Sequence, residues 1–306
     1  MTFQIKILGT SSATPTIDRN HSSQLVSIQN HYFLVDCGEA TQLQLLKYKV
    51  KILKINAIFI SHLHGDHYLG LFGLLATMQL QSRDQPLWIY GPSGLDELIT
   101  LHFKYSQMTL DYALYFVDIE KEETILFQDE KVIVEKIPLQ HRISCMGFIF
   151  KEQPKKRSII KEYLPEDVKI QDILRLKDGY DIYNQTTGAL IKNESVTNPP
   201  KKSYSYAYCT DTLYDERIIS RITGVDLLYH ESTFLADQEA RARDTFHSTA
   251  RQAATIALKA NVNKLLLGHF SARYKDLKPF LDEAKAVFQR TVLAVEGMDI
   301  IIEDEV

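Results

Sequence analysis

The chain has 306 residues, of which 45% are hydrophobic and 24% charged, a composition typical of a soluble globular protein with a sizeable core. Its formal net charge of −4 excludes an overall basic surface, so any contact with nucleic acid must come from local patches. The three cysteines (Cys37, Cys145 and Cys209) are far apart and odd in number, which argues against a disulfide framework and favours a reducing cytosol.

The first half of the chain predicts alternating strands and helices. Residues 3–8 alternate like a strand, and they lack the basic lead and long apolar segment of a signal peptide. Further strands are expected at 24–28, 32–36, 55–60, 87–90, 115–119, 132–137 and 147–150, with helices at 39–48, 69–80 and 94–105. No apolar run approaches the ~20 residues that cross a bilayer, so we expect a cytoplasmic protein without membrane contact.

The composition changes at about residue 151. Residues 151–203 are rich in Lys, Asp, Glu and Asn, which predicts either an inserted arm with short elements of its own or a long solvated excursion. The alternating pattern then resumes, with strands at 204–210, 225–230, 264–268 and 291–303 and helices at 248–260 and 278–289. Alternation in both halves predicts an α/β fold of two sheets with helices outside.

The most informative segment is residues 61–67, Ser-His-Leu-His-Gly-Asp-His. It offers three imidazoles and one carboxylate, from His62, His64, Asp66 and His67. A strand end that delivers four such groups into a tight turn is well placed to hold a metal ion. Imidazole and carboxylate ligands suit zinc, and cysteine is absent here. The alternative is a polar turn in which histidines cluster by chance.

Three further polar residues, His141, Asp211 and His269, each follow an apolar strand. Taken singly, a residue at such a position is more often a cap or a hydrogen-bonded structural residue. Together with residues 61–67, they predict that ligands from several strand ends complete a metal site.

These motifs resemble the metallo-β-lactamase superfamily and, within it, the short-form ribonuclease Z family of tRNA 3′-end endonucleases. The HxHxDH pattern of residues 62–67 carries the superfamily resemblance. The narrower resemblance rests on residues 9–16, 36–39, 230–234 (His-Glu-Ser-Thr-Phe), 247–249 (His-Ser-Thr) and 268–274. It implies a four-layer αββα sandwich of the metallo-β-lactamase type, a single domain over 1–306, from which residues 151–203 protrude as an inserted substrate-binding arm.

The resemblance also implies two zinc ions per subunit, with Mn²⁺ or another divalent ion as an alternative. By motif, the first zinc is held by His62, His64 and His141, the second by Asp66, His67 and His269, and Asp211 bridges both. Two metals about 3.5–4 Å apart can activate a water and stabilise an in-line displacement at phosphorus.

Catalytic roles follow from the same resemblance. Asp66 is the expected proton acceptor, and His247, just before a helix start, is the best candidate to protonate or stabilise the leaving oxygen. Glu231 would orient His247. The alternatives are a strand-end carboxylate that caps a local group and a helix N-terminal histidine without a catalytic role. His230 is expected to be structural, because neighbouring strand residues point to opposite faces.

Substrate contacts are expected at three places. Arg273 could bind a phosphate through its guanidinium group or form a surface salt bridge. Arg19 and Asn20 resemble part of a loop that senses the tRNA 3′ end, or they stabilise the turn. The insertion lacks the Gly/Pro-rich run usual in the family's arm, but it carries a basic cluster that could contact phosphates: Lys155, Lys156 and Arg157.

The implied activity is that of a zinc-dependent endoribonuclease. It would remove the 3′ trailer from precursor tRNA by hydroxide attack on a phosphodiester, leaving a 3′-hydroxyl on the tRNA and a 5′-phosphate on the trailer. The expected form is a homodimer in which one subunit's arm serves the other's site, without a nucleotide cofactor. A hydrolase or phosphodiesterase acting on a small molecule would leave the HEST and HST segments and the insertion unexplained. A non-catalytic RNA-binding protein is disfavoured by the complete ligand set.

Overall fold

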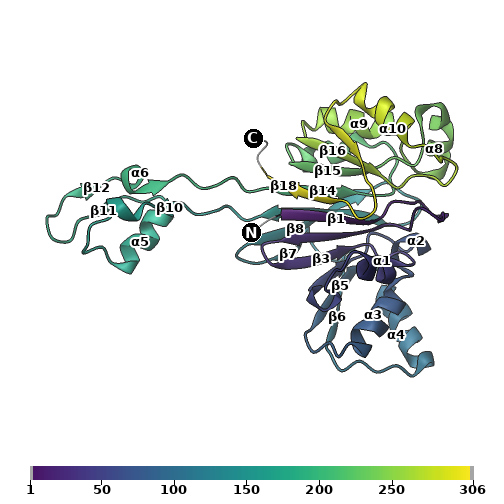
Figure 1. Cartoon of the computed structure of the whole chain (residues 1–306), viewed down its shortest axis with the longest axis horizontal. Coiled ribbons are helices and arrows are strands. Elements are labelled where there is room, and N and C mark those ends of the chain that lie inside the picture. The colour runs from purple at the N-terminus through teal and green to yellow at the C-terminus, as the bar shows by residue number, and fades with distance from the viewer. Residues whose placement is uncertain (1–2, 304–306) are drawn as a thin grey trace. The chain divides into compact units, whose positions relative to one another are not determined.

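The computed structural model describes residues 3–303, which fall into two compact units. The first unit comprises the chain up to Lys151 and from Tyr204 onward, and the second comprises Glu152–Ser203 (Figure 1). Within the described residues, no helix has both the length and the apolar character needed to span a bilayer.

One sheet of the first unit has seven strands in the order β18-β1-β2-β3-β4-β5-β6. They are β1 (Phe3–Gly9), β2 (Ser23–Ile28), β3 (His31–Val35), β4 (Ala57–Phe59), β5 (Leu87–Gly91), β6 (Leu114–Asp118) and β18 (Asp299–Ile302). Strands β3 to β6 run parallel, with Val35 opposite Phe59 and Phe59 opposite Tyr90. Their carboxyl ends therefore meet at one edge of the sheet.

The other large sheet also has seven strands, in the order β17-β16-β15-β14-β9-β8-β7. They are β7 (Ile125–Gln128), β8 (Val132–Leu139), β9 (Cys145–Glu152), β14 (Ser205–Cys209), β15 (Leu227–Glu231), β16 (Lys264–Gly268) and β17 (Thr291–Leu293). Strands β14 to β17 are parallel, so the segments that follow them also leave the sheet at one edge.

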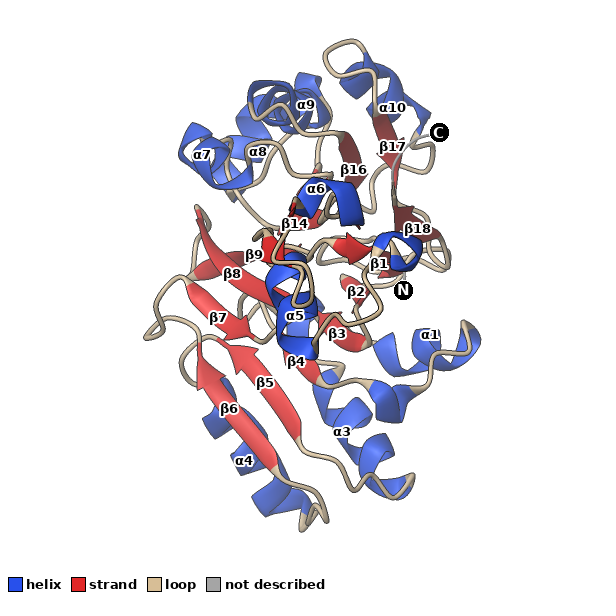
Figure 2. Cartoon of the chain, turned by 90° about the vertical axis from the view of Figure 1, so that its left-hand side faces the viewer, coloured by secondary structure: helices blue, strands red, loops and turns tan. Residues whose placement is uncertain are grey.

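Helices cover the outer face of each sheet (Figure 2). Beside the first sheet lie α1 (Thr41–Lys47), α2 (Gly65–Tyr68), α3 (Leu71–Leu80), α4 (Leu95–Ser106) and the 3₁₀ turn η1 (Ile52–Lys54). Beside the second lie α7 (Ile219–Ile222), α8 (Glu239–Thr245), α9 (Ala250–Lys259) and α10 (Lys278–Lys285), with 3₁₀ turns η3 (Glu216–Ile218) and η4 (Ala236–Gln238). Between the sheets the Phe33 and Phe150 rings stack with centroids 5.7 Å apart. The predicted αββα layering is confirmed.

The second unit is built from short elements. They are β10 (Ser158–Ile159), η2 (Lys161–Tyr163), α5 (Ile170–Lys177), β11 (Ile182–Tyr183), β12 (Leu190–Ile191), α6 (Asn193–Val196) and β13 (Thr197–Asn198). Strand β10 pairs with β13 and β11 with β12. Leu176, Ile182 and Val196 form a small buried core of its own.

At two places the observed elements differ from those expected from the sequence. The helix expected at 69–80 begins at Leu71 as α3 and is preceded by the separate short helix α2; Gly70 lies between the two, close to the backbone of another segment. A Cβ atom at Gly70 would lie 2.1 Å from the carbonyl oxygen of Gly38. The edge strand β7 was not expected, since its four residues, Ile-Leu-Phe-Gln, are too short to show an alternating pattern.

Candidate two-metal site

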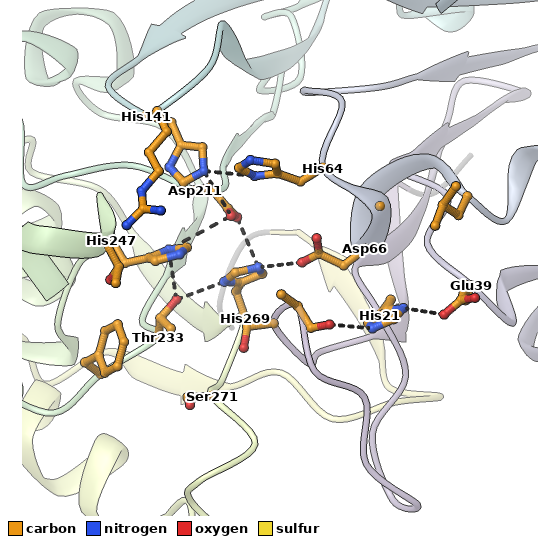
Figure 3. A pocket seen from close by; sticks show the side chains of 17 residues that line it. His21, Glu39, His64, Asp66, His141, Asp211, Thr233, His247, His269 and Ser271 are labelled. Atoms are coloured by element: carbon orange, nitrogen blue, oxygen red, sulfur yellow. Dashed lines mark hydrogen bonds and ion pairs between the residues drawn. The ribbon is translucent and has the colours of Figure 1, made fainter. Parts of the chain in front are cut away.

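The candidate ligands come from loops that follow strands of both sheets. His62 and His64 follow β4, while Asp211 follows β14 and His269 follows β16. Figure 3 shows the side chains of His64, Asp66, His141, Asp211 and His269 turned toward one another. The strand ends thus bring together residues that are distant in the sequence.

The first group of ligand atoms lies around His64. Its Nδ1 is 3.0 Å from His62 Nε2 and 3.1 Å from His141 Nε2. Asp211 Oδ2 completes the group, 3.7 Å from His62 Nε2 and 3.8 Å from His141 Nε2. One ligand atom from each of the four residues thus lies within 4.8 Å of the others, so a single ion could contact all four.

The second group is formed by Asp66, His67, Asp211 and His269. Asp66 Oδ2 lies 3.3 Å from His67 Nε2 and 3.5 Å from His269 Nε2. Asp211 Oδ1 lies 3.4 Å and 3.1 Å from the same two nitrogens. The two oxygens of Asp211 therefore face different groups, which is the geometry that a bridging carboxylate requires.

The other ring nitrogen of each of four candidate histidine ligands has a partner. His67 Nδ1 lies 2.7 Å from Asp36 Oδ2, and His269 Nδ1 lies 2.9 Å from Thr233 Oγ1. His141 Nδ1 lies 2.9 Å from the carbonyl oxygen of Phe246, and His62 Nδ1 lies 3.0 Å from Ser61 Oγ. Such contacts fix the ring orientation and direct Nε2 into the site, as is usual around protein-bound metals.

Several buried atoms in the second group fit a cation. Asp66 Oδ2, His67 Nε2 and His269 Nε2 have no hydrogen-bond partner among the described residues. An unpartnered buried polar atom is costly, and a metal ion would satisfy all three at once. Burial lowers the pKa of His67, but the charges of Asp66, Asp211 and Asp36 outweigh this effect and raise it well above the usual value. This excess of negative charge favours a cation.

The first group has different electrostatics. Burial lowers the pKa of His62, His64 and His141. These imidazoles are therefore neutral at physiological pH, the form in which histidine binds a metal. Burial raises the pKa of Asp211, but the charges of His269 and His67 outweigh this effect and hold it well below its usual range. The donor set of the first group is thus three neutral imidazoles and one carboxylate, which suits zinc.

His247 lies beside both groups and is bound to Glu231. Its Nδ1 is 2.9 Å from Glu231 Oε1 and 3.9 Å from Asp211 Oδ2. Glu231 Oε2 accepts hydrogen bonds from the Thr233 backbone N–H (3.0 Å) and hydroxyl (2.7 Å). Its Oε1 also accepts one from the Thr212 N–H at 2.9 Å. The buried carboxylate is held rigidly and fixes the imidazole.

The charges of this pair are set by their contact. Burial lowers the pKa of His247, but the carboxylates of Glu231 and Asp211 raise it to about 9. Burial raises the pKa of Glu231, but the His247 cation and its hydrogen bond hold it below its ordinary value. At neutral pH the pair is an imidazolium next to a carboxylate, so His247 carries a proton that it can donate.

The two groups open onto a cavity of about 540 Å³. His64, Asp66, His141, Asp211, His247 and His269 all line it. His21, to which the sequence assigned no role, also lines it, with Nε2 3.2 Å from the carbonyl oxygen of Ala13. His230 does not line it, and its Nδ1 lies 2.8 Å from the carbonyl oxygen of Glu231.

The candidate substrate-binding residues near this cavity have protein partners. The Arg19 guanidinium donates to the carbonyl oxygens of Tyr274 (3.0 Å) and Ser271 (3.2 Å). Asn20 donates through its side chain to Glu296 at 2.8 Å. These contacts tie the 13–20 loop to two C-terminal segments. Arg273 is exposed and lies over the Phe234 ring, with 5.0 Å between the guanidinium carbon and the ring centroid.

The basic cluster of the insertion is also paired, within the second unit. Lys155 Nζ lies 2.6 Å from Glu152 Oε2, and Lys156 Nζ lies 2.7 Å from Asp178 Oδ1. Arg157 Nε donates to Thr197 Oγ1 at 2.7 Å. In the structure, each side chain of the cluster thus contacts a residue of its own unit.

Asp36 is the principal site residue to which the sequence assigned no role. It is fully buried, with a left-handed φ of 54°, and accepts hydrogen bonds from the Ser61 N–H and hydroxyl and the Tyr208 hydroxyl. It thereby joins His67 to the segment that carries the other motif histidines. Its signal in the sequence is a carboxylate directly after the apolar strand that ends at Val35.

The chain is similar to known proteins over its whole length. The chain is 48% identical to a protein named ribonuclease Z from Cytophaga hutchinsonii, covering 100% of this chain and 98% of that one. It is 43% identical to a ribonuclease Z from Bacteroides thetaiotaomicron, over 99% and 96% of the two chains. A family model described as Anti-Pycsar protein Apyc1 matches residues 3–158.

Solved structures are similar over nearly the whole chain. Human tRNase Z, short form, is 28% identical with a TM-score of 0.69, covering 98% of this chain and 100% of that one. A metallo-β-lactamase fold protein from Bacillus subtilis is 20% identical with a TM-score of 0.69, over 98% and 100%. The second similarity supports the fold alone.

Proposed function

The chain belongs to the ribonuclease Z family, and from that premise we propose that this endoribonuclease removes the 3′ trailer from precursor tRNA. The membership rests on relatives that match the full chain, whereas the Apyc1 model matches its first half. The observation that carries the proposal is the pair of ligand groups joined by Asp211, beside which His247 is held by Glu231.

We propose that the two groups hold two divalent cations, with zinc as the preferred ion. His62, His64 and His141 would hold the first, Asp66, His67 and His269 the second, and Asp211 both. When bound, such a pair activates water and neutralises negative charge on the phosphate. The unpartnered Nε2 and Oδ2 atoms of the second group support this assignment.

The protein's own groups then handle the protons. Asp66, whose other role is as a ligand, would accept the proton of the attacking water. His247 is protonated at neutral pH and would donate its proton to the leaving 3′ oxygen of the tRNA. Glu231 would keep the imidazole oriented and cationic. The products of this reaction are a tRNA 3′-hydroxyl and a trailer with a 5′-phosphate.

The remaining expectations belong to the same proposal. The second unit would bind tRNA as an arm, and the protein would act as a cytoplasmic homodimer. Full-length relatives at 38–48% identity favour a nuclease over a hydrolase that acts on small molecules.

The test is incubation of the zinc-loaded protein with a precursor tRNA that carries a 3′ trailer, followed by mapping of both new ends. We expect a single cut at the end of the tRNA body, leaving a 3′-hydroxyl and a 5′-phosphate, that chelator abolishes. The proposal is wrong if zinc- or manganese-loaded protein leaves the precursor intact.

A further inference from the structure

A cluster of lysines lies on the first unit, in the segment between α1 and β4. Between Glu39 and Asp66 the chain has four lysines and no acidic residue, although the whole protein has a net charge of −4. The four are Lys47, Lys49, Lys51 and Lys54, all of them exposed. We call these four residues the lysine patch.

The backbone under the lysine patch is fixed by buried neighbours. Leu45 of α1 and Ile52 of η1 are buried in the core beneath the first sheet. The Val50 N–H donates to the carbonyl oxygen of Leu45 at 2.8 Å, which closes the turn after α1. The backbone that carries the lysines is therefore already ordered, so only their side chains have to be ordered when a ligand binds.

The positive charges of the lysine patch are not neutralised within residues 3–303. No carboxylate forms an ion pair with any of the four, whereas Lys6, on neighbouring β1, pairs with Asp299 at 2.7 Å. Lys47 and Lys54 lie over aromatic rings instead, 5.2 Å from the Tyr48 centroid and 5.6 Å from that of Tyr32. A polyanion could therefore bind these ammonium groups without displacing a carboxylate of the described residues.

A cavity of about 320 Å³ lies among these residues. Lys49, Lys51 and Lys54 line it, and so do Tyr32 and Tyr48. Ammonium groups beside aromatic faces suit a nucleic-acid backbone, whose phosphates need positive charge and whose sugars and bases can pack on rings. Such contacts do not depend on sequence, as binding of many different tRNAs would require.

The position of the cavity separates it from the cleavage site. Tyr32 lies near the start of β3, and Asp36 directly follows its end. The two are four residues apart, or about 13 Å at ~3.3 Å per residue. The cavity therefore lies toward the end of β3 opposite to the end that is followed by Asp36, the partner of His67.

We propose that the lysine patch binds the sugar–phosphate backbone of the tRNA substrate away from the scissile bond. The inference rests on the proposed function for its ligand, and it assigns to the first unit a tRNA contact separate from the arm. The paired state of Lys155, Lys156 and Arg157 strengthens it, since those side chains already have partners in their own unit.

The test compares two variants that each remove two positive charges. K49Q/K51Q alters the lysine patch, and K104Q/K278Q neutralises exposed lysines of α4 and α10. The equilibrium dissociation constant for precursor tRNA is measured with excess chelator over a series of salt concentrations. For K49Q/K51Q we expect Kd to rise on the order of tenfold at ~0.1 M salt. The slope of log Kd against log salt concentration should fall by about one to two. K104Q/K278Q and the charge-preserving K49R/K51R should remain near wild type.

The unfolding temperature and hydrolysis of bis(p-nitrophenyl) phosphate serve as references for folding and for the metal centre. Equal Kd values for K49Q/K51Q and wild type, or an equal loss in K104Q/K278Q, would overturn the proposal. An altered sedimentation mass with unchanged tRNA affinity would assign the patch to contact between two copies of the chain, and would also overturn it. If wild-type protein cuts precursor tRNA and K49Q/K51Q binds it with wild-type affinity, the lysine-patch proposal is wrong and the proposed function stands. Wild-type protein that neither binds nor cuts refutes the proposed function as well.

Discussion

His247 Nδ1 lies 2.9 Å from Glu231 Oε1, and through this contact the candidate proton donor is connected to His269, a proposed metal ligand. The other oxygen of Glu231 accepts a hydrogen bond from the Thr233 hydroxyl, whose oxygen lies 2.9 Å from His269 Nδ1. One buried carboxylate thus orients both rings. Changes at His247 should disturb proton transfer alone, while changes nearer the ligands should disturb metal binding.

Replacing His247 by alanine removes the proton donor but none of the proposed ligands. We expect His247→Ala to keep its full metal content and to lose cleavage by roughly 10²–10⁴-fold, the usual contribution of general acid catalysis. Single-turnover cleavage of precursor tRNA, together with metal analysis of the same sample, measures both quantities. Cleavage at the wild-type rate would show that another group donates the proton.

The pH dependence of cleavage should report the same residue. The pKa of His247 is raised to about 9, and its protonated form is the acid. The active form is therefore present below that pH, and the rate should fall as the pH rises through about 9. In Glu231→Gln the charge that raises this pKa is lost, so the falling limb should move to lower pH. If the rate falls at the same pH in wild type and Glu231→Gln, the assignment of His247 as the proton donor is wrong.

Asp36 should affect the metal through His67. Asp36→Asn keeps the size of the side chain but weakens its contact with His67 Nδ1. We expect metal affinity to fall by about 10–100-fold, as is typical when the partner of a ligating histidine is changed. His64→Ala removes a proposed ligand and should lose the ion outright. In competitive chelator titrations, metal affinity should therefore decrease from wild type to Asp36→Asn to His64→Ala. Wild-type metal affinity in Asp36→Asn would exclude this orienting role.

The second unit should serve substrate binding and not chemistry. It has its own core and its own strand pairs, so replacing residues 154–198 by a short Gly/Ser linker should leave the first unit folded. We expect weaker binding of precursor tRNA and little change in hydrolysis of bis(p-nitrophenyl) phosphate. If both activities fall together, the segment supports the fold.

The sequence predicted the proposed ligands because they follow apolar strands and match the motifs of a known family. Asp211 and His269 follow the parallel strands β14 and β16, whose carboxyl ends meet at one edge, whereas His141 follows β8 and was assigned to the site through the motif resemblance. The partners that orient these ligands could not be predicted in the same way. Thr233 reaches a residue 36 positions away and Asp36 one 31 positions away, and such contacts depend on tertiary packing.

The basic residues show a second limit of the sequence. Lys155 and Lys156 form a charged run that indicates a nucleic-acid contact, yet each has a carboxylate partner in the folded unit. The lysine patch is spaced out among apolar residues such as Val50 and Ile52, so no basic run is visible. Which charges have partners is decided by the fold, since the partner of a lysine can lie far along the chain.

Stepwise reconstitution of metal-free protein with zinc, followed by cleavage of precursor tRNA at each step, tests the two-metal proposal most directly. The two ligand groups joined by Asp211 predict that cleavage rises until two equivalents of zinc are bound per chain and then stays constant. Full activity at one equivalent, or uptake of two without cleavage of the precursor, would contradict it.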